Sequence, residues 1–201
     1  MRRLLVLATA LLLVGGCARS EDTLVPAPTR PAGTPLPLGK NDLPLTAGRW
    51  VSPDGFVPAL SVQVGTGWTS VHRYADAFDV GRPDPQRDAP LVVVTFSVSG
   101  ASSAAAAVAD LATAPGATAP VADTLAGSPA QRLDVLGGSA SVYRSRDGDL
   151  ELDGAQGQRL RFLVADVGGV VVVAAVLVPD ARAWAQRLAV AAPVLASLRT
   201  Y

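Results

Sequence analysis

The stretch from Arg159 to Val178 constrains the fold of this chain more than any other part of it. Two apolar runs, LRFLVADV and VVVVAAVLV, stand on either side of the pair Gly168-Gly169. Two glycines between β-forming runs are typical of a tight hairpin, because both central residues of such a turn need positive φ. The second run is apolar at nearly every position, so it predicts a central strand in a sheet that is covered on both faces.

Other segments predict further strands. Residues 91–98 (LVVVTFSV) are rich in branched side chains and predict another buried strand. Apolar and polar residues alternate over Leu60–Val64, residues 65–67 predict a turn, and Trp68–Tyr74 predicts the next strand. The proline-rich residues 81–90 predict a loop. Further short strands are expected at residues 121–125, 131–136, 139–145 and 150–152.

Two helices are expected to pack on this sheet. Ser102 or Ser103 is suited to cap the first helix. The second begins at Pro179 or Asp180, and Pro193 is expected to kink or split it. Its apolar residues recur every three or four positions and predict one buried stripe: Trp184, Leu188, Ala191, Leu195 and Leu198. The chain therefore predicts an α+β fold, an antiparallel β-sheet with helices packed on its faces.

The N-terminal residues predict export and a lipid anchor. Arg2-Arg3 precedes the uncharged apolar stretch Leu4–Val14. A basic start and a short apolar segment are marks of a secretory signal peptide, and this segment is too short to span a bilayer. Val14-Gly15-Gly16-Cys17 resembles the lipobox of bacterial lipoproteins, which implies cleavage between Gly16 and Cys17 and acyl chains on the Cys17 thiol. Cys17 is the only cysteine, so no disulfide forms within the chain. An ordinary cleaved signal peptide is the alternative, and the general and twin-arginine export routes both stay open.

Three regions follow from this organisation. We expect residues 1–16 to be the signal peptide, residues 17–48 to be the lipidated cysteine with a disordered linker, and residues 49–201 to be one α+β domain. The linker has few large apolar residues, and its composition favours an extended chain over a packed core. Its prolines are Pro26, Pro28, Pro31, Pro35, Pro37 and Pro44. Such a linker would hold the domain away from the membrane.

Composition limits the chemistry of the domain. The chain has 17 basic and 17 acidic residues, so nothing indicates a nucleic-acid partner. It has one histidine, its only lysine is Lys40 in the linker, and its only cysteine is Cys17. These counts exclude a cysteine nucleophile, a Schiff-base lysine in the domain, and a zinc site built on several His or Cys ligands. We expect no enzymatic activity, no cofactor and no metal.

Three groups of residues remain as site candidates. His72 has the chemistry of a general base that Asp76 or Asp79 would orient, although a surface histidine is the simpler interpretation. Trp50 and Trp68 would form a binding surface if exposed, with core packing as the alternative. The third group is an acidic cluster that resembles the opening of a calcium-binding loop. Its alternation of acidic and apolar residues is also typical of a strand with one solvent-exposed face. Its members are Asp147, Asp149, Glu151 and Asp153.

Several packing and turn motifs together resemble a known family. They are Phe56–Trp68, Ser128–Val135, Asp166–Gly169 with the valines after it, and Ala196–Leu198. Their order resembles that of exported actinobacterial lipoproteins with a PsbP-like domain, in particular the LpqN-like group. The resemblance covers residues 49–201 and implies an antiparallel sheet with helices on its faces. It implies no catalytic residues.

The sequence leaves three functions open. The first is a non-catalytic module, anchored by lipid on the extracytoplasmic face of the cell membrane, that binds an envelope protein or a cell-wall polymer. The second is a carrier of a lipid or small molecule in an apolar pocket between sheet and helices. The third is an envelope hydrolase that uses carboxylates alone.

Overall fold

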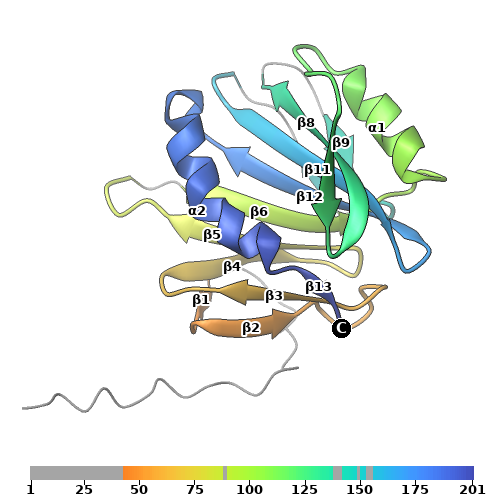
Figure 1. The fold of residues 1–201 in the computed structure, drawn as a ribbon. Helices are drawn as coiled ribbons and strands as arrows, with labels where there is room; N and C mark the ends of the chain where they lie inside the picture. Colours follow the sequence, from red (N-terminus) through yellow and green to blue (C-terminus); the bar gives the residue numbers. More distant parts are fainter. Residues whose placement is uncertain (1–42, 88–89, 138–141, 149, 153–155) are drawn as a thin grey trace, which may run out of the picture.

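An eight-stranded antiparallel sheet forms the centre of the protein (Figure 1). The computed structural model describes residues 43–87, 90–137, 142–148, 150–152 and 156–201, apart from the side chains of His72 and Arg73. In spatial order the strands are β1 (Leu43–Leu45), β4 (Trp68–Arg73), β5 (Ala77–Pro83), β6 (Pro90–Val98), β12 (Val170–Val178), β11 (Arg159–Val167), β8 (Ser128–Leu136) and β7 (Val121–Leu125).

Among the described residues, two smaller sheets, two α-helices and one short 3-10 helix complete the fold. One small sheet has the order β13-β3-β2 and the other pairs β10 with β9. Their bounds are β2 (Gly48–Val51), β3 (Leu60–Val64), β13 (Arg199–Thr200), β9 (Tyr143–Arg144) and β10 (Glu151–Leu152). The helices are α1 (Ala104–Ala112), the short 3-10 helix η1 (Ala181–Ala183) and α2 (Trp184–Ala196). This arrangement confirms the predicted α+β class.

The predicted hairpin lies at the centre of the large sheet. β11 and β12 pair in register from Arg159↔Val178 to Val167↔Val170. Gly168 and Gly169 form the turn with φ of 59° and 85°, which is the conformation that only glycine adopts without strain. β12 has β11 on one side and β6 on the other, as its continuous apolar sequence predicted.

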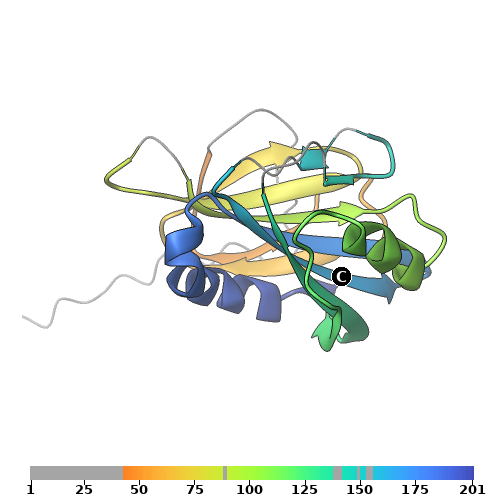
Figure 2. The same cartoon turned by 90° about the horizontal axis from the view of Figure 1, so that it is seen from above.

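The two helices cover opposite faces of the sheet. Successive residues of a strand point to opposite faces, and the two buried clusters divide β12 in this way. Val172, Ala174 and Val176 belong to the cluster that α2 covers, whereas Val171, Val173 and Ala175 belong to the cluster that α1 covers. Figures 1 and 2 both show α1 and α2 well apart over the sheet. We refer to these sides as the α1 face and the α2 face.

The folded part begins earlier than the sequence indicated. Leu43–Leu45, which we assigned to the linker, pairs with β4 through Leu43↔Ser70, Pro44↔Thr69 and Leu45↔Trp68. Leu45 is 6% exposed and joins the core on the α2 face. Proline is tolerated here because β1 is an edge strand, where one side of the backbone needs no partner.

Strand β5 was missed, and its last residues were predicted as loop. The sequence AFDVGRP carries an aspartate, a glycine and a proline, all of which weaken a strand pattern. The strand forms because β4 and β6 flank it. Gly81 is needed there, since a Cβ at this position would lie 2.8 Å from Cγ2 of Val71.

Helix α2 is not split at Pro193 and continues to Ala196. Ala191 and Leu198 of the predicted stripe are buried, and the other three members pack partly buried against the core. Val194, which the stripe omitted, is only 2% exposed. Helix α1 follows its prediction, because Ser103 Oγ accepts from the N–H of Ala106 at 3.1 Å.

Candidate binding pocket

Polar side chains are buried on the α1 face where β5 and β6 lie side by side. Asp79 of β5 lies opposite Thr95 of β6, and Ala77 lies opposite Ser97. Thr95 and Ser97 are each 1% exposed, and Asp79 is 4% exposed. Buried polar groups require hydrogen-bond partners, so this polar patch depends on what covers it.

Tyr143 of β9 covers part of this polar patch. Its phenol oxygen lies 2.9 Å from Ser97 Oγ, and its ring lies 6.0 Å from the ring of Phe162. Burial raises the pKa of Tyr143 to about 12, and the negative charge of Asp76 acts in the same direction. Hydrogen bonding to Ser97 and Ser99 opposes this shift of the pKa. Tyr143 is therefore a neutral phenol at physiological pH.

Asp76 connects the sheet to the turn that follows β9. Its Oδ2 accepts a hydrogen bond of 2.7 Å from the N–H of Asp147, and its carbonyl accepts one of 2.8 Å from Val98. The carbonyl of Val98 in turn accepts from the N–H of Arg146 at 2.8 Å. Asp76 is fully buried, and its Oδ1 has no hydrogen-bond partner among the residues described. The Asp76 carboxylate therefore lies inside the fold, and Asp76 is not among the residues that line the pocket described below.

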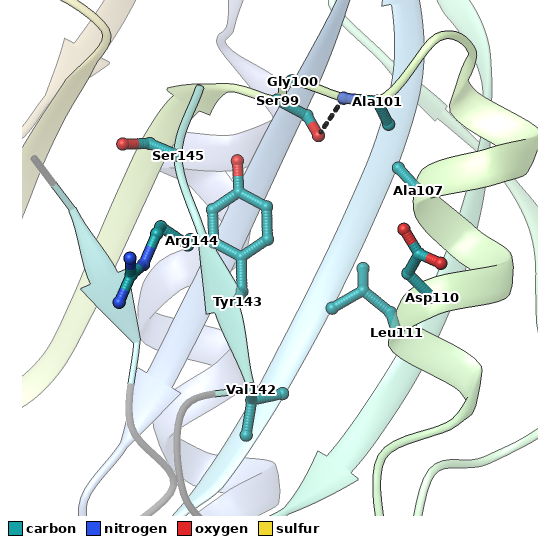
Figure 3. Close-up of a pocket in the computed structure, with 10 residues that line it drawn as sticks. All are labelled: Ser99, Gly100, Ala101, Ala107, Asp110, Leu111, Val142, Tyr143, Arg144 and Ser145. Carbon is teal, nitrogen blue, oxygen red and sulfur yellow. Dashed lines mark hydrogen bonds between the residues drawn. The ribbon is translucent and has the colours of Figure 1, made fainter. Parts of the chain in front are cut away.

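A pocket of about 370 Å³ lies between α1, the end of β6 and the chain around β9. This volume falls in the range of small-molecule sites. Figure 3 shows the ring of Tyr143 on one side and Leu111 and Asp110 of α1 on the other. The lining residues are Ser99, Gly100, Ala101, Ala107, Asp110, Leu111, Val142, Tyr143, Arg144 and Ser145.

The charges around the pocket are unequal. Arg144 is paired with Glu151 at 3.1 Å, and Figure 3 shows its guanidinium pointing away from the gap between Tyr143 and α1. In contrast, the carboxylate of Asp110 is exposed and makes no hydrogen bond or ion pair with any residue that the structure describes. The pocket therefore presents more uncompensated negative than positive charge.

A second, smaller pocket of about 260 Å³ lies on the α2 face. Its charged groups are already paired, because Arg132 lies 2.9 Å from Asp123 and Arg161 bonds both oxygens of Asp134 at 2.7 and 2.9 Å. Trp184 stacks beside it, with its ring centroid 5.4 Å from the guanidinium carbon of Arg161. Both arginine–aspartate pairs join neighbouring strands of the sheet, and Arg161 also contacts Trp184 at the start of α2.

The predicted tryptophan surface is wrong. Trp50 and Trp68 are each 3% exposed and belong to the core on the α2 face. The indole N–H of Trp50 donates to the carbonyl of Thr46 at 3.0 Å, so the polar edge of the ring is satisfied inside the fold. Trp50 of the small sheet and Trp68 of the large sheet belong to the same buried cluster, so the two sheets pack against each other there.

The structure describes only some of the other predicted site residues. His72 lies in β4, but its side chain is outside the description, and so are Gly16 and Cys17. The triad of His72 with Asp76 or Asp79 therefore stays a prediction.

Of the acidic cluster, Asp147 and Glu151 are described and Asp149 and Asp153 are not. Asp147 is held by Arg146 at 3.0 Å, and this hydrogen bond lowers the pKa of Asp147. Glu151 is held by Arg144. Over the part of the chain that the structure describes, no three His, Cys, Asp or Glu side chains come together as a metal site.

The pocket residues were missed by sequence reasoning. Tyr143 and Ser97 lie far apart in the sequence, and nothing in their local patterns links them. Asp110 is a single carboxylate on a helix, and this pattern alone does not distinguish a site residue from a solvent-facing one. A weak signal existed in β6, because Thr95 and Ser97 interrupt an otherwise apolar strand on one face only.

No helix within the described ranges is both long and apolar enough to cross a membrane.

The chain was compared with known proteins. No family model and no curated protein sequence matches it. A crystal structure from Bacteroides thetaiotaomicron VPI-5482 is similar over 78% of this chain with a TM-score of 0.45 and 12% identity. The match covers 49% of that protein, so the chain spans about half its length. A second similar structure is the crystal structure of LpqN from Mycobacterium tuberculosis, which is described as involved in cell envelope biogenesis. The match covers 79% of this chain and 90% of the LpqN chain, with a TM-score of 0.41 and 12% identity. Similarity at this level carries no argument about function, and the PsbP-like label stays a prediction.

Proposed function

We propose that the chain is a lipoprotein of the bacterial cell envelope, anchored through acyl chains on Cys17, whose domain binds a partner there and catalyses no reaction. The observation that carries the anchor is the N-terminal sequence. Basic residues, the short apolar stretch Leu4–Val14 and the small residues Gly15 and Gly16 all precede the only cysteine of the chain. Acyl chains on that thiol would contribute about 0.8 kcal/mol of membrane binding for each buried CH₂.

Metabolic labelling with radioactive palmitate tests the anchor. We expect the wild-type protein to incorporate label and to partition into the detergent phase, whereas Cys17→Ala incorporates none. Ser20→Ala is the matched control, since it changes a neighbouring residue outside the lipobox and should label like the wild type. Label that persists in Cys17→Ala, or a wild type without label, would contradict the anchor.

Binding without catalysis is supported by the state of the buried polar groups. The phenol of Tyr143 keeps its proton at neutral pH, because its pKa is about 12. Ser97 is hydrogen-bonded to that phenol and to the carbonyl of Val173, and one oxygen of Asp76 is held by the N–H of Asp147. These contacts hold the polar groups of the α1 face in a structural network.

Cross-linking in intact cells tests for a partner. We expect a specific cross-linked envelope protein or cell-wall polymer with the anchored wild type. The same domain exported from Cys17→Ala should give less of it, because the anchor concentrates the domain near its partner. Repeated cross-linking that traps nothing specific would favour the second candidate function.

The second candidate is a carrier of a small molecule, and the pocket beside α1 favours it. The pocket has an apolar wall, formed by Ala107, Leu111 and Val142, and a polar end with Ser99 and Tyr143. This combination is typical of ligand sites. Native mass spectrometry of the chain purified from membranes in mild detergent would show a co-purifying ligand mass if the protein is a carrier. Only the free protein mass would be seen if it is not.

A further inference from the structure

We propose that the pocket between α1 and β9 binds a small organic cation, an alkylammonium group with an apolar body. This inference rests on the second candidate function, the carrier, and names the class of molecule carried. It is independent of whether the protein also has a macromolecular partner.

The charge of the pocket favours a cation. Asp110 places a carboxylate at the wall, and no described residue neutralises it. Asp76 does not line the pocket, but its negative charge acts on the lining residue Tyr143, whose pKa it raises.

The nearby arginines are engaged by carboxylates other than Asp110. Arg144 is engaged by Glu151 and points away from the gap. Arg146 is engaged by the carboxylate of Asp147 through two contacts of 3.0 and 3.2 Å, and this hydrogen bond raises the pKa of Arg146. An anionic ligand would therefore meet the unpaired carboxylate of Asp110 and no unpaired guanidinium among the described residues.

The aromatic wall of the pocket also suits a cation. The ring of Tyr143 lines the gap, and an ammonium group that lies over its face within about 6 Å of the centroid would be attracted to it. The phenol stays neutral, so it donates or accepts hydrogen bonds without adding a charge of its own. Leu111 and Ala107 opposite the ring would contact the apolar body of the ligand.

The test compares three probes of nearly identical shape that differ in charge. They are choline, its neutral carbon isostere 3,3-dimethylbutan-1-ol, and the anion 3,3-dimethylbutanoate. Binding to the chain purified in mild detergent is measured by calorimetry and by the chemical shifts of the probe. We expect choline to bind more tightly than the neutral alcohol, and the anion to bind least.

Variants locate the site. Asp110→Asn should weaken choline binding about two- to five-fold and leave the neutral alcohol unaffected. Asp123→Asn, the same change on the α2 face, should alter neither. Tyr143→Leu should weaken choline binding about three- to thirty-fold through loss of the ring. If Tyr143→Leu fails to fold, Tyr143→Phe replaces it and should keep choline binding within about two-fold, since the ring remains.

The outcomes distinguish failure of the cation proposal from failure of the carrier function. Equal or tighter binding of the neutral or anionic probe would overturn the cation proposal and leave the carrier function standing. Choline binding that Asp110→Asn does not weaken would overturn the assignment to this pocket. If millimolar choline does not bind, the cation proposal fails. A co-purifying ligand of other chemistry in native mass spectrometry would then still support a carrier.

Discussion

The phenol oxygen of Tyr143 lies 2.9 Å from Oγ of Ser97, which joins the short β9–β10 sheet to the centre of the large one. Ser97 Oγ also donates to the carbonyl of Val173 at 3.4 Å. Both side chains are buried. Together with the hydrogen bonds from Asp147 to Asp76 and from Arg146 to Val98, this contact holds one wall of the pocket against the α1 face.

Removing this hydrogen bond should destabilise the fold. Tyr143→Phe keeps the ring but leaves the buried Ser97 hydroxyl without its phenol partner, and we expect a loss of about 1–2 kcal/mol in the free energy of unfolding. Urea unfolding measures it. In a double-mutant cycle, Ser97→Ala should cost little more in the Tyr143→Phe background, because the contact is already gone. Fully additive effects would show that the two side chains do not interact.

Tyr143 should also give the fold a specific loss of stability at alkaline pH. Its pKa rises from 10.0 to about 12 on folding. The unfolded chain therefore loses the phenol proton first, and the stability that Tyr143 contributes is complete below pH 10 and declines up to about pH 12. Unfolding of wild type and Tyr143→Phe should be compared across this range. The wild type should lose more stability than the variant, and parallel curves would refute the shift.

Replacing Asp76 should lower the free energy of unfolding more than replacing an exposed carboxylate does. Asp76→Ala removes the acceptor of the part-buried hydrogen bond from the N–H of Asp147, and we expect a loss of about 1–3 kcal/mol in the free energy of unfolding. Asp110→Ala is the matched control, since its exposed carboxylate has no contact that the structure records, and its effect should stay within about 0.5 kcal/mol. Thermal unfolding distinguishes the two. Similar small effects would mean that Asp76 does not hold the turn after β9.

Gly81 should resist substitution. In Gly81→Ala the new Cβ would meet Cγ2 of Val71 at 2.8 Å, and we expect a loss of about 1–3 kcal/mol from overpacking. Gly65→Ala is the control, because a Cβ at Gly65 meets nothing within 4 Å. The double variant Gly81→Ala, Val71→Ala should recover part of the loss. A stable Gly81→Ala protein would show that β4 and β5 are further apart than described.

The sequence predicted the structure best where interactions between residues close in the chain determine the conformation. The Gly168-Gly169 hairpin and the Ser103 cap were predictable, because turn chemistry and capping act over a few residues. Strand β5 was not, since it forms through its two neighbours and against its own aspartate, glycine and proline. The burial of Trp50 depends on β2 packing against the large sheet, and the pairing of Tyr143 with Ser97 joins segments that no local pattern connects.

The anchor on Cys17 is the central claim, and the mass of the N-terminal peptide of the membrane-purified protein tests it most directly. We predict that this peptide begins at Cys17 and carries a diacylglyceryl group on the thiol. A peptide that begins at Met1, or one with an unmodified Cys17, would contradict the account.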